Sequence, residues 1–312
     1  MNRIVRHFVL ATAIAVVSLS AAPPKKRAVR PPAQRTAVAV PSPAAETVRP
    51  ALWKVADSDT TIYLFGTVHA LPKGIAWYQG NIAQAFEQSH ELVTEIVESD
   101  ASPMQSAVLS KALLPQGQTL RGLMTPENRA AYEAALKAQG MPEGAFDPLK
   151  PWYAAIFLAA MPMLKEGFDP NEGVEKTLDT RAKALKRPHS ALETAEYQLG
   201  LFDGLPQATQ LRFLSEVIRT MPEAKNEVAD MVKAWKAGDA ETLARIMNDD
   251  EDEPELMEKL LFQRNRTWAE WIRARLDRPG TVFLAVGAGH LAGDGSVQKE
   301  LAARGIGSTR LQ

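Results

Sequence analysis

The chain has 312 residues, of which 46% are hydrophobic and 23% are charged. This composition is ordinary for a globular protein and excludes a fully disordered, collagen-like or multi-span membrane protein. The first 50 residues carry eight Lys/Arg against Glu46, so with a total of −1 the rest of the chain carries −8. An acidic body does not suit binding to nucleic acid, which depends on neutralising phosphates. The absence of cysteine excludes disulfides, a thiol nucleophile and a thiolate zinc site.

Residues 1–22 have the three parts of a secretory signal peptide. Two arginines precede an apolar run over Phe8–Leu19, and small residues follow, with cleavage expected after Ser20 or Ala21. A membrane anchor is the alternative, but the run is shorter than the ~20 residues that span a bilayer. We therefore expect a periplasmic or secreted protein that has no integral membrane segment after cleavage.

Residues 23–50 are rich in Pro, Ala and Arg and contain no aromatic side chain. This composition predicts a disordered linker. Its positive charge could attract it to an anionic membrane or cell-wall surface, but a plain solvated linker is the favoured interpretation. The folded domain is expected over residues 51–312.

The folded part begins and ends with strand patterns. Apolar or β-branched runs predict strands over residues 60–65, 91–97, 189–192, 281–286 and 308–311. Helical patterns cover residues 81–88, 126–139, 151–164, 174–186, 223–237 and 254–276. The segment 151–164 is apolar nearly all round and predicts a core helix or the lining of a cavity. The order predicts an α/β fold whose mixed central sheet is built from both ends of the chain, with a large, mostly helical middle region.

Two histidines occur in the same local setting. Gly66-Thr67-Val68-His69 and Gly287-Ala288-Gly289-His290 each close a hydrophobic strand. The carboxyl ends of strands line the ligand crevice of an open α/β sheet, and glycine there leaves room for a substrate beside the imidazole. The pair therefore predicts a functional site, and two hydrogen-bonded core histidines are the alternative.

Two acids are candidates to act with these histidines. Glu95 lies in the apolar stretch ELVTEIV, where a buried glutamate is costly unless it is paired. Its shifted pKa would then suit general-base chemistry. Glu98 is a competing candidate, and a solvent-facing Glu95 is the alternative. Glu193 ends a short strand-like segment and is the second acid.

Arg264 and Asn265 lie on a predicted helix among apolar neighbours. They could bind an anionic group or tie the helix to the sheet. The chain lacks the G-x-S-x-G, H-E-x-x-H, P-loop and G-x-G-x-x-G motifs. Serine esterase, zincin, NTPase and dinucleotide-binding functions are therefore poor interpretations.

These motifs, in this order, resemble the TraB/GumN family, which includes the Tiki proteins. The resemblance runs through the segments 52–55, 62–69, 92–97, 192–199, 264–265, 286–293 and 301–311. The hallmark of the family is two G-x-x-H motifs and a glutamate, which here fall on Gly66/His69, Gly287/His290 and Glu95. The resemblance implies a sheet core with added helices, as in erythromycin esterase and ChaN-like proteins.

Tiki proteins are described as metal-dependent proteases that use manganese or cobalt. The resemblance implies that His69, Glu95 and His290 bind a divalent metal ion, manganese or cobalt before zinc, which activates water. Glu193 would then orient a ligand or shuttle the proton. Glu175 follows Gly173-Val174 where many relatives have Asp, a departure that leaves the role of that helix open.

The predicted function is an exported metal-dependent hydrolase that acts on peptides or another small-molecule substrate. A metal-free hydrolase, in which one histidine is the general base and Glu95 orients it, is the first alternative. A non-catalytic protein that binds heme, a peptide signal or an exopolysaccharide precursor is the second. The sequence leaves the substrate and a homo-oligomeric state open.

Overall fold

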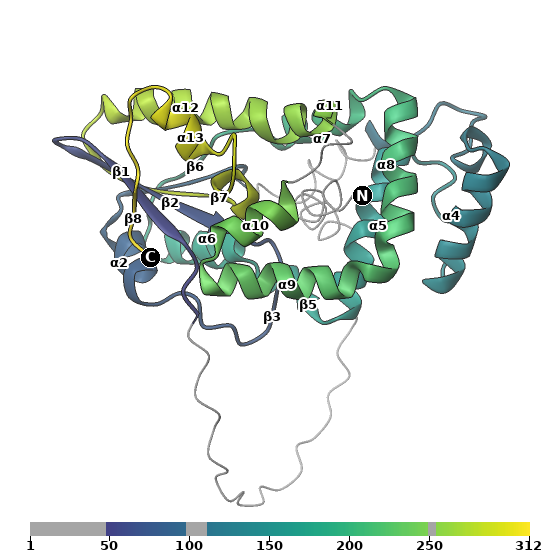
Figure 1. Cartoon of the computed structure of the whole chain (residues 1–312), viewed down its shortest axis with the longest axis horizontal. Helices are drawn as coiled ribbons and strands as arrows, with labels where there is room; N and C mark the ends of the chain where they lie inside the picture. Colours follow the sequence, from purple (N-terminus) through teal and green to yellow (C-terminus); the bar gives the residue numbers. More distant parts are fainter. Residues whose placement is uncertain (1–47, 98–110, 249–253) are drawn as a thin grey trace, which may run out of the picture.

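The computed structural model describes residues 48–97, 111–248 and 254–312 (Figure 1). The predicted signal peptide and the linker up to residue 47 lie outside these ranges. The last three residues of the predicted linker, however, belong to the folded body. Val48 is buried in the hydrophobic core, and the Arg49 N–H donates to the Lys236 carbonyl at 2.7 Å. The described fold therefore includes the three residues that precede the expected start at residue 51.

The central sheet of the described chain has six strands in the order β6-β4-β7-β2-β1-β8. Their bounds are β1 Leu52–Ala56, β2 Thr60–Thr67, β4 Glu91–Thr94, β6 His189–Ala191, β7 Gly280–Gly287 and β8 Thr309–Arg310. The four strands β6, β4, β7 and β2 are parallel, whereas β1 is antiparallel to both β2 and β8. The mixed sheet joins both ends of the chain, as predicted.

Alternation along β2 and β7 sends side chains to two hydrophobic cores. Ile62, Leu64, Val282 and Leu284 contribute to the core beneath α12 (Gln263–Leu276) and α13 (Val297–Ala302). Phe65, Phe283 and Ala285 contribute to the larger core on the opposite face. Both faces of these strands are covered, which explains why the sequence of β7 is nearly continuously apolar.

Helices dominate the region between the strands. Their bounds are α2 Gly80–Gln88, α4 Pro126–Ala138, α5 Pro151–Lys165, α6 Val174–Ala184, α7 Ala195–Asp203, α8 Gln207–Thr220, α9 Ala224–Ala237, α10 Ala240–Met247 and α11 Pro254–Met257, before α12 and α13. A small two-stranded sheet pairs β3 (Leu71–Pro72) with β5 (Phe168–Asp169). The single helix predicted over 254–276 is interrupted by a π-helical turn at Glu258–Phe262.

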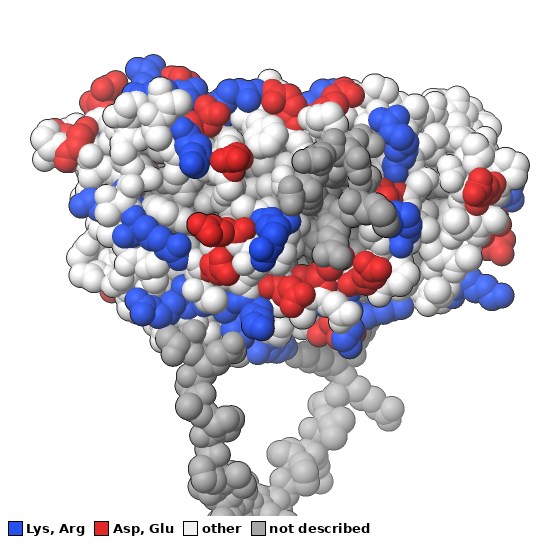
Figure 2. All heavy atoms as spheres, in the orientation of Figure 1, with Lys and Arg blue, Asp and Glu red and all other residues white. Residues whose placement is uncertain are grey.

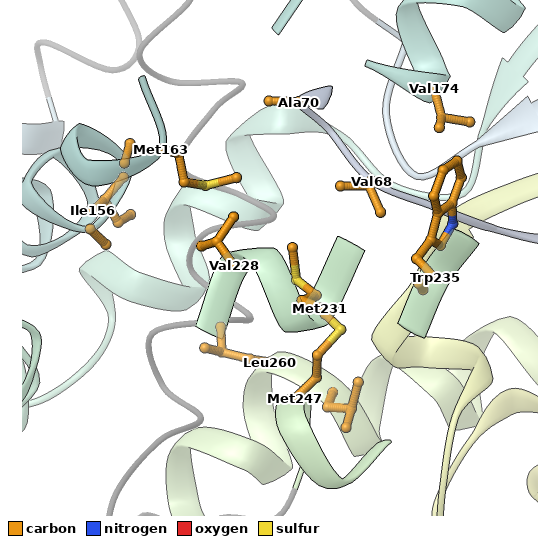
Figure 3. Close-up of a cluster of buried hydrophobic side chains, with 14 of the residues drawn as sticks. Val68, Ala70, Ile156, Met163, Val174, Val228, Met231, Trp235, Met247 and Leu260 are labelled. Carbon is orange, nitrogen blue, oxygen red and sulfur yellow. The ribbon is translucent and has the colours of Figure 1, made fainter. Parts of the chain in front are cut away.

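The larger core continues from the sheet into the helical region. Ten of the fifteen residues of α5 are buried, which makes it a core helix. Figure 3 shows Val68 and Ala70, just after β2, in the same hydrophobic cluster as Met231 of α9 and Met247 of α10. The loop that carries His69 is therefore supported by the helical middle region. No helix in the described ranges is long and apolar enough to cross a membrane.

The face of the molecule seen in Figure 2 carries both signs of charge. Asp and Glu side chains lie among Lys and Arg side chains, on either side of atoms that are not described. Such mixing makes a surface without a large field of one sign. The visible face is therefore not a basic surface.

Candidate functional site

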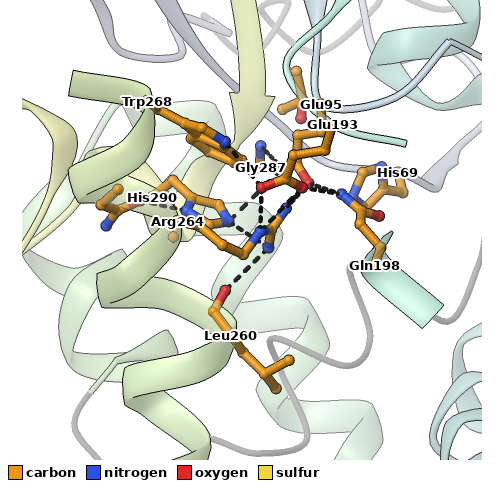
Figure 4. A network of polar contacts seen from close by, with 12 residues as sticks. His69, Glu95, Glu193, Gln198, Leu260, Arg264, Trp268, Gly287 and His290 are labelled. Atoms are coloured by element: carbon orange, nitrogen blue, oxygen red, sulfur yellow. Dashed lines mark hydrogen bonds and ion pairs between the residues drawn. The ribbon is translucent and has the colours of Figure 1, made fainter. Parts of the chain in front are cut away.

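The candidate site lies at the carboxyl ends of the four parallel strands (Figure 4). His69 follows β2, Glu95 follows β4, Glu193 follows β6, and His290 lies in the 3-10 turn Ala288–Leu291 after β7. Since these strands are neighbours in the sheet, the structure brings all four predicted residues together. Glu95 follows its strand rather than lying within it, because β4 ends at Thr94. The competing candidate Glu98 lies outside the described residues.

Arg264 is the centre of the polar network in Figure 4. Its Nη2 donates to Glu95 Oε2 at 2.6 Å and to Glu193 Oε2 at 2.8 Å, and its Nε donates to Glu193 Oε1 at 2.9 Å. The side chain is only 2% exposed. Burial opposes the charge, but the two carboxylates outweigh it and raise the pKa of Arg264. These contacts support the second of the two predicted roles, in which Arg264 ties its helix to the sheet.

Glu95 is fully engaged by hydrogen-bond donors. Besides Arg264, its Oε1 accepts from the Gly287 N–H at 2.8 Å and its Oε2 accepts from Gln198 Nε2 at 2.9 Å. Burial would raise the pKa of Glu95, but the positive charge of Arg264 holds it well below its usual range. Glu95 is therefore an ionised carboxylate, and Gly287 acts through its backbone N–H.

The His290 ring has a defined tautomer. Asn265 Nδ2 donates to the Gly295 carbonyl at 2.7 Å, so its Oδ1 faces His290 Nδ1 at 2.5 Å and accepts a proton from it. The lone pair on Nε2 then accepts from Arg264 Nη1 at 3.1 Å. Burial, together with the charge of Arg264, lowers the pKa of His290 well below its ordinary value. His290 is therefore a neutral imidazole, and Asn265 is its positioning partner.

His69 stands at the edge of this network and pairs with a different acid. Its Nδ1 lies 2.8 Å from Glu175 Oε1, which also accepts from the Thr67 hydroxyl. Burial would lower the pKa of His69, but the Glu175 carboxylate outweighs burial and raises it. Of the four strand-end side chains His69 is the most exposed, at 18%, and no described residue hydrogen-bonds its Nε2. The first-turn acid of α6 therefore orients His69, a role that the sequence did not assign to Glu175.

Gln198 and Trp268 complete the network and were missed as site residues. Gln198 Nε2 donates to both Glu95 and Glu193, each at 2.9 Å, and Trp268 Nε1 donates to Glu193 Oε1 at 2.9 Å. Their positions in the sequence could have predicted them. Gln198 lies one helical turn inside α7, and Trp268 lies four residues after Arg264 on the same helix. Both place a polar group on the buried side of a helix.

The π-helical turn Glu258–Phe262 helps to place Arg264. The turn ends two residues before it, and the Leu260 carbonyl accepts from Arg264 Nη1 at 3.0 Å. Single π turns within α-helices are frequent at functional sites. A continuous α-helix, which the sequence predicted, would present a different register to the sheet.

Gly66 allows the two G-x-x-H loops to approach closely. A Cβ at Gly66 would lie 3.1 Å from Ala288 Cα, and the Gly66 carbonyl accepts from Trp235 Nε1 at 2.8 Å. The register pairs Thr67 with Gly287, so both motifs leave the sheet side by side. Gly66 is therefore a position where the two loops pack closely together and a side chain would not fit without movement.

The predicted metal ligands do not form one chelating set in this arrangement. No group of three His, Cys, Asp or Glu side chains is placed to hold a metal ion in the part of the chain that the structure describes. Arg264 contacts both Glu95 and His290, and His69 is turned toward Glu175. A divalent ion therefore does not fit among His69, Glu95 and His290 as they stand.

Comparison with known proteins finds similarity over most of the chain. The uncharacterized protein YbaP of Escherichia coli (strain K12) is 25% identical over 244 residues, which cover 77% of this chain and 87% of YbaP. YbaP of Shigella flexneri matches to the same extent. No solved structure matches significantly. The model of the TraB/PrgY/gumN family matches residues 51–310, and the chain belongs to this family.

Proposed function

We propose that this protein is an exported hydrolase that cleaves peptide bonds with His69 as the general base. The observation that carries the proposal is the His69–Glu175 pair, whose Nδ1–Oε1 distance is 2.8 Å. Glu175 holds one ring nitrogen, which leaves Nε2 to take a proton from water. A histidine oriented by a carboxylate is an established arrangement for general-base catalysis.

The surrounding network supports this role by holding the neighbouring loops in place. Glu95, Glu193 and His290 are each fixed by Arg264, at the ends of the three other parallel strands. Sites whose groups are held by packed, hydrogen-bonded neighbours keep their geometry during reaction. Export is proposed from the signal-like residues 1–22. The manganese, cobalt or zinc ion that the resemblance implies is a separate prediction, and no step of this mechanism uses it.

The test compares four versions of the chain from residue 23 onward in a fluorogenic peptide library. Wild type is compared with His69→Gln, Glu175→Gln and the control His90→Gln. His90 is an exposed histidine at the opposite end of β4, where its Nδ1 accepts from the Thr281 N–H. Circular dichroism and thermal unfolding first establish that every variant is folded.

We expect His69→Gln to lose roughly 100-fold or more of kcat/KM, the usual contribution of a general base, while His90→Gln keeps wild-type activity. Unchanged turnover in a folded His69→Gln would contradict the proposal. If wild type hydrolyses no peptide but binds one in a manner that requires His69, the non-catalytic binding protein becomes the better interpretation.

A further inference from the structure

We infer that the carboxyl-terminal end of α6 is a docking surface for an anionic phospholipid membrane. This surface, the α6 patch, consists of the exposed Leu185 and four cations around it: Arg181, Lys183, Lys186 and Arg187. The inference concerns a surface outside the polar network of the strand ends, and it does not depend on the proposed hydrolysis.

The first argument is charge. Residues 181–187 read Arg-Ala-Lys-Ala-Leu-Lys-Arg and contain four cations and no acid. Two acids lie beside them. Asp179 is buried and hydrogen-bonded to Lys183 and His189, and the Glu87 carbonyl accepts from Arg187 Nη2 at 3.1 Å. Clusters of Lys and Arg at the end of a helix attract the headgroups of anionic lipids, so the patch suits such a surface.

The second argument is the apolar side chain among these cations. Leu185 is the C-cap residue of α6 and is 55% exposed, the highest value among the large hydrophobic side chains of the described ranges. A surface that combines apolar and cationic side chains can place the first in the headgroup region and the second on phosphate. A soluble anionic polymer offers charge but no apolar layer. Leu185 therefore favours a lipid membrane as the partner.

The third argument is the backbone of Lys186. Its φ is 51°, and within the described ranges it is the only residue other than glycine with a positive φ. It lies in the turn that ends α6, where the Lys186 N–H donates to the Lys183 carbonyl and the Arg187 N–H donates to the Ala182 carbonyl. Glycine is the favoured residue at this position. A lysine here opposes the local backbone preference, and a function of its side chain explains it.

The two arginines of the patch are held by aromatic rings. The guanidinium group of Arg181 lies 3.6 Å from the centre of the Tyr78 ring, and that of Arg187 lies 4.6 Å from the centre of the Phe86 ring. Arg187 Nη1 also donates to the Phe86 carbonyl at 2.5 Å. These contacts present both cations in one arrangement, which lowers the entropy lost on binding.

The helix α6 connects the patch to the candidate site. Its first turn carries Glu175 beside His69, and the turn after its last residue leads into the amino end of β6. A helix of 11 residues is about 16 Å long, so the patch lies at the opposite end of α6 from His69. A membrane bound at the patch would leave the site on the side away from the lipid.

The experiment measures binding of the chain from residue 23 onward to phosphatidylcholine vesicles with and without about 30% phosphatidylglycerol, an anionic lipid. Sedimentation of the vesicles gives the bound fraction at low and at high salt. The variants are Lys186→Gly, Lys186→Gln, Lys186→Arg and Leu185→Ser. The matched control is Lys233→Gln, which removes an exposed cation of α9. The basic linker is the same in every variant, so differences between them report the patch.

We expect wild type to bind the anionic vesicles, to bind the neutral vesicles much less, and to be released by salt. Lys186→Gly and Lys186→Gln should each bind about fivefold more weakly, and Leu185→Ser about threefold or more. Lys186→Arg and Lys233→Gln should bind like wild type. In urea, Lys186→Gly should unfold at a higher concentration than Lys186→Gln, because glycine adopts the left-handed conformation without strain.

A fluorescent label tests insertion directly. The chain has no cysteine, so Leu185→Cys and the control Lys233→Cys each provide a single labelling site. We expect a nitrobenzoxadiazole group at position 185 to shift its emission to shorter wavelength on anionic vesicles, and the same group at position 233 to show no shift.

Three results would overturn the inference. The first is wild type that binds anionic vesicles no better than neutral ones. The second is equal binding of anionic vesicles by wild type, Lys186→Gln and Leu185→Ser, which would place the binding elsewhere on the chain. The third is dextran sulfate, a soluble anionic polymer, binding as tightly as the vesicles while Leu185→Ser and the label at position 185 report no insertion.

Discussion

Glu175 and Asp179 lie one turn apart on α6, and each pairs with the Nδ1 of a different histidine. Glu175 Oε1 lies 2.8 Å from His69, and Asp179 Oδ1 lies 3.1 Å from His189. His189 Nε2 in turn lies 2.8 Å from the hydroxyl of Thr94, the last residue of β4. One helix therefore orders the ends of two strands of the candidate site.

The first pair predicts how the titration of His69 responds to its acid. Glu175→Gln removes the negative charge that raises the pKa of His69, so that pKa should fall. A general base is active when it is unprotonated, so the rise of kcat/KM with pH should move to lower pH. The His69 pKa is measured directly from its Cε1–H signal by NMR, and the pH–rate profile is measured beside it.

The control for this prediction is Glu196→Gln, which removes an exposed acid of α7. It should leave the titration of His69 unchanged. The prediction is wrong if Glu175→Gln and Glu196→Gln give the same midpoint as wild type.

The second pair predicts a loss of stability in Asp179→Asn. Burial opposes the charge of Asp179, but Lys183 and His189 outweigh it and lower its pKa. Asparagine keeps the size but loses the charge, so we expect about 1–3 kcal/mol less stability in urea unfolding at pH 7. Asp230→Asn, an exposed change on α9, should have little effect. Equal midpoints for the two variants would show that the Asp179–His189 pair is not stabilising.

The positions of the strand-end residues could be predicted because each follows a short apolar run. Phe283 and Leu284 are buried on opposite faces of the same strand, so the run itself marks a central strand. Such runs end where the chain turns, and parallel strands end at one edge. The strand Leu52–Ala56, which lies between β2 and β8, was not predicted, because it is only five residues long and both Trp53 and Lys54 are partly exposed.

The partners of these residues could not be predicted, because they depend on long-range register. Arg264 is separated from Glu95 by 169 residues, and a π turn two residues before it changes the register of the helix. The spacing of apolar residues predicts a helix over residues 254–276. It does not reveal that the turn Glu258–Phe262 is π-helical. The acid that pairs with His69 is Glu175 rather than Glu95, because α6 packs with its first turn beside His69.

Glu95 predicts a specific dependence of stability on pH. Its pKa is lower in the folded chain than in the unfolded chain, mainly because Arg264 outweighs the effect of burial. A lowered carboxyl pKa stabilises the fold above the unfolded value of about 4.3 and loses that contribution as the pH falls below it. Wild type should therefore lose urea stability more steeply than Glu95→Gln between about pH 5 and pH 3. Parallel pH curves for the two proteins would contradict this assignment.

Gly173 predicts the cost of disturbing the backbone at His69. A Cβ at Gly173 would lie 2.3 Å from the His69 carbonyl oxygen, and the next residue, Val174, donates its N–H to the Val68 carbonyl. Since the colliding atoms are backbone, the loop or α6 has to move. We expect Gly173→Ala to cost about 1–3 kcal/mol in urea unfolding and to weaken the His69–Glu175 contact.

Gly200→Ala is the matched control for Gly173→Ala. Gly200 lies within α7, and a Cβ there meets nothing within 4 Å. Alanine is the better helix former, so this variant should gain roughly 0.5–1 kcal/mol and keep the wild-type titration of His69. We therefore expect the free energy of unfolding to fall in Gly173→Ala and to rise in Gly200→Ala. If Gly173→Ala is as stable as wild type, the close approach of α6 to the His69 loop is not what positions the histidine.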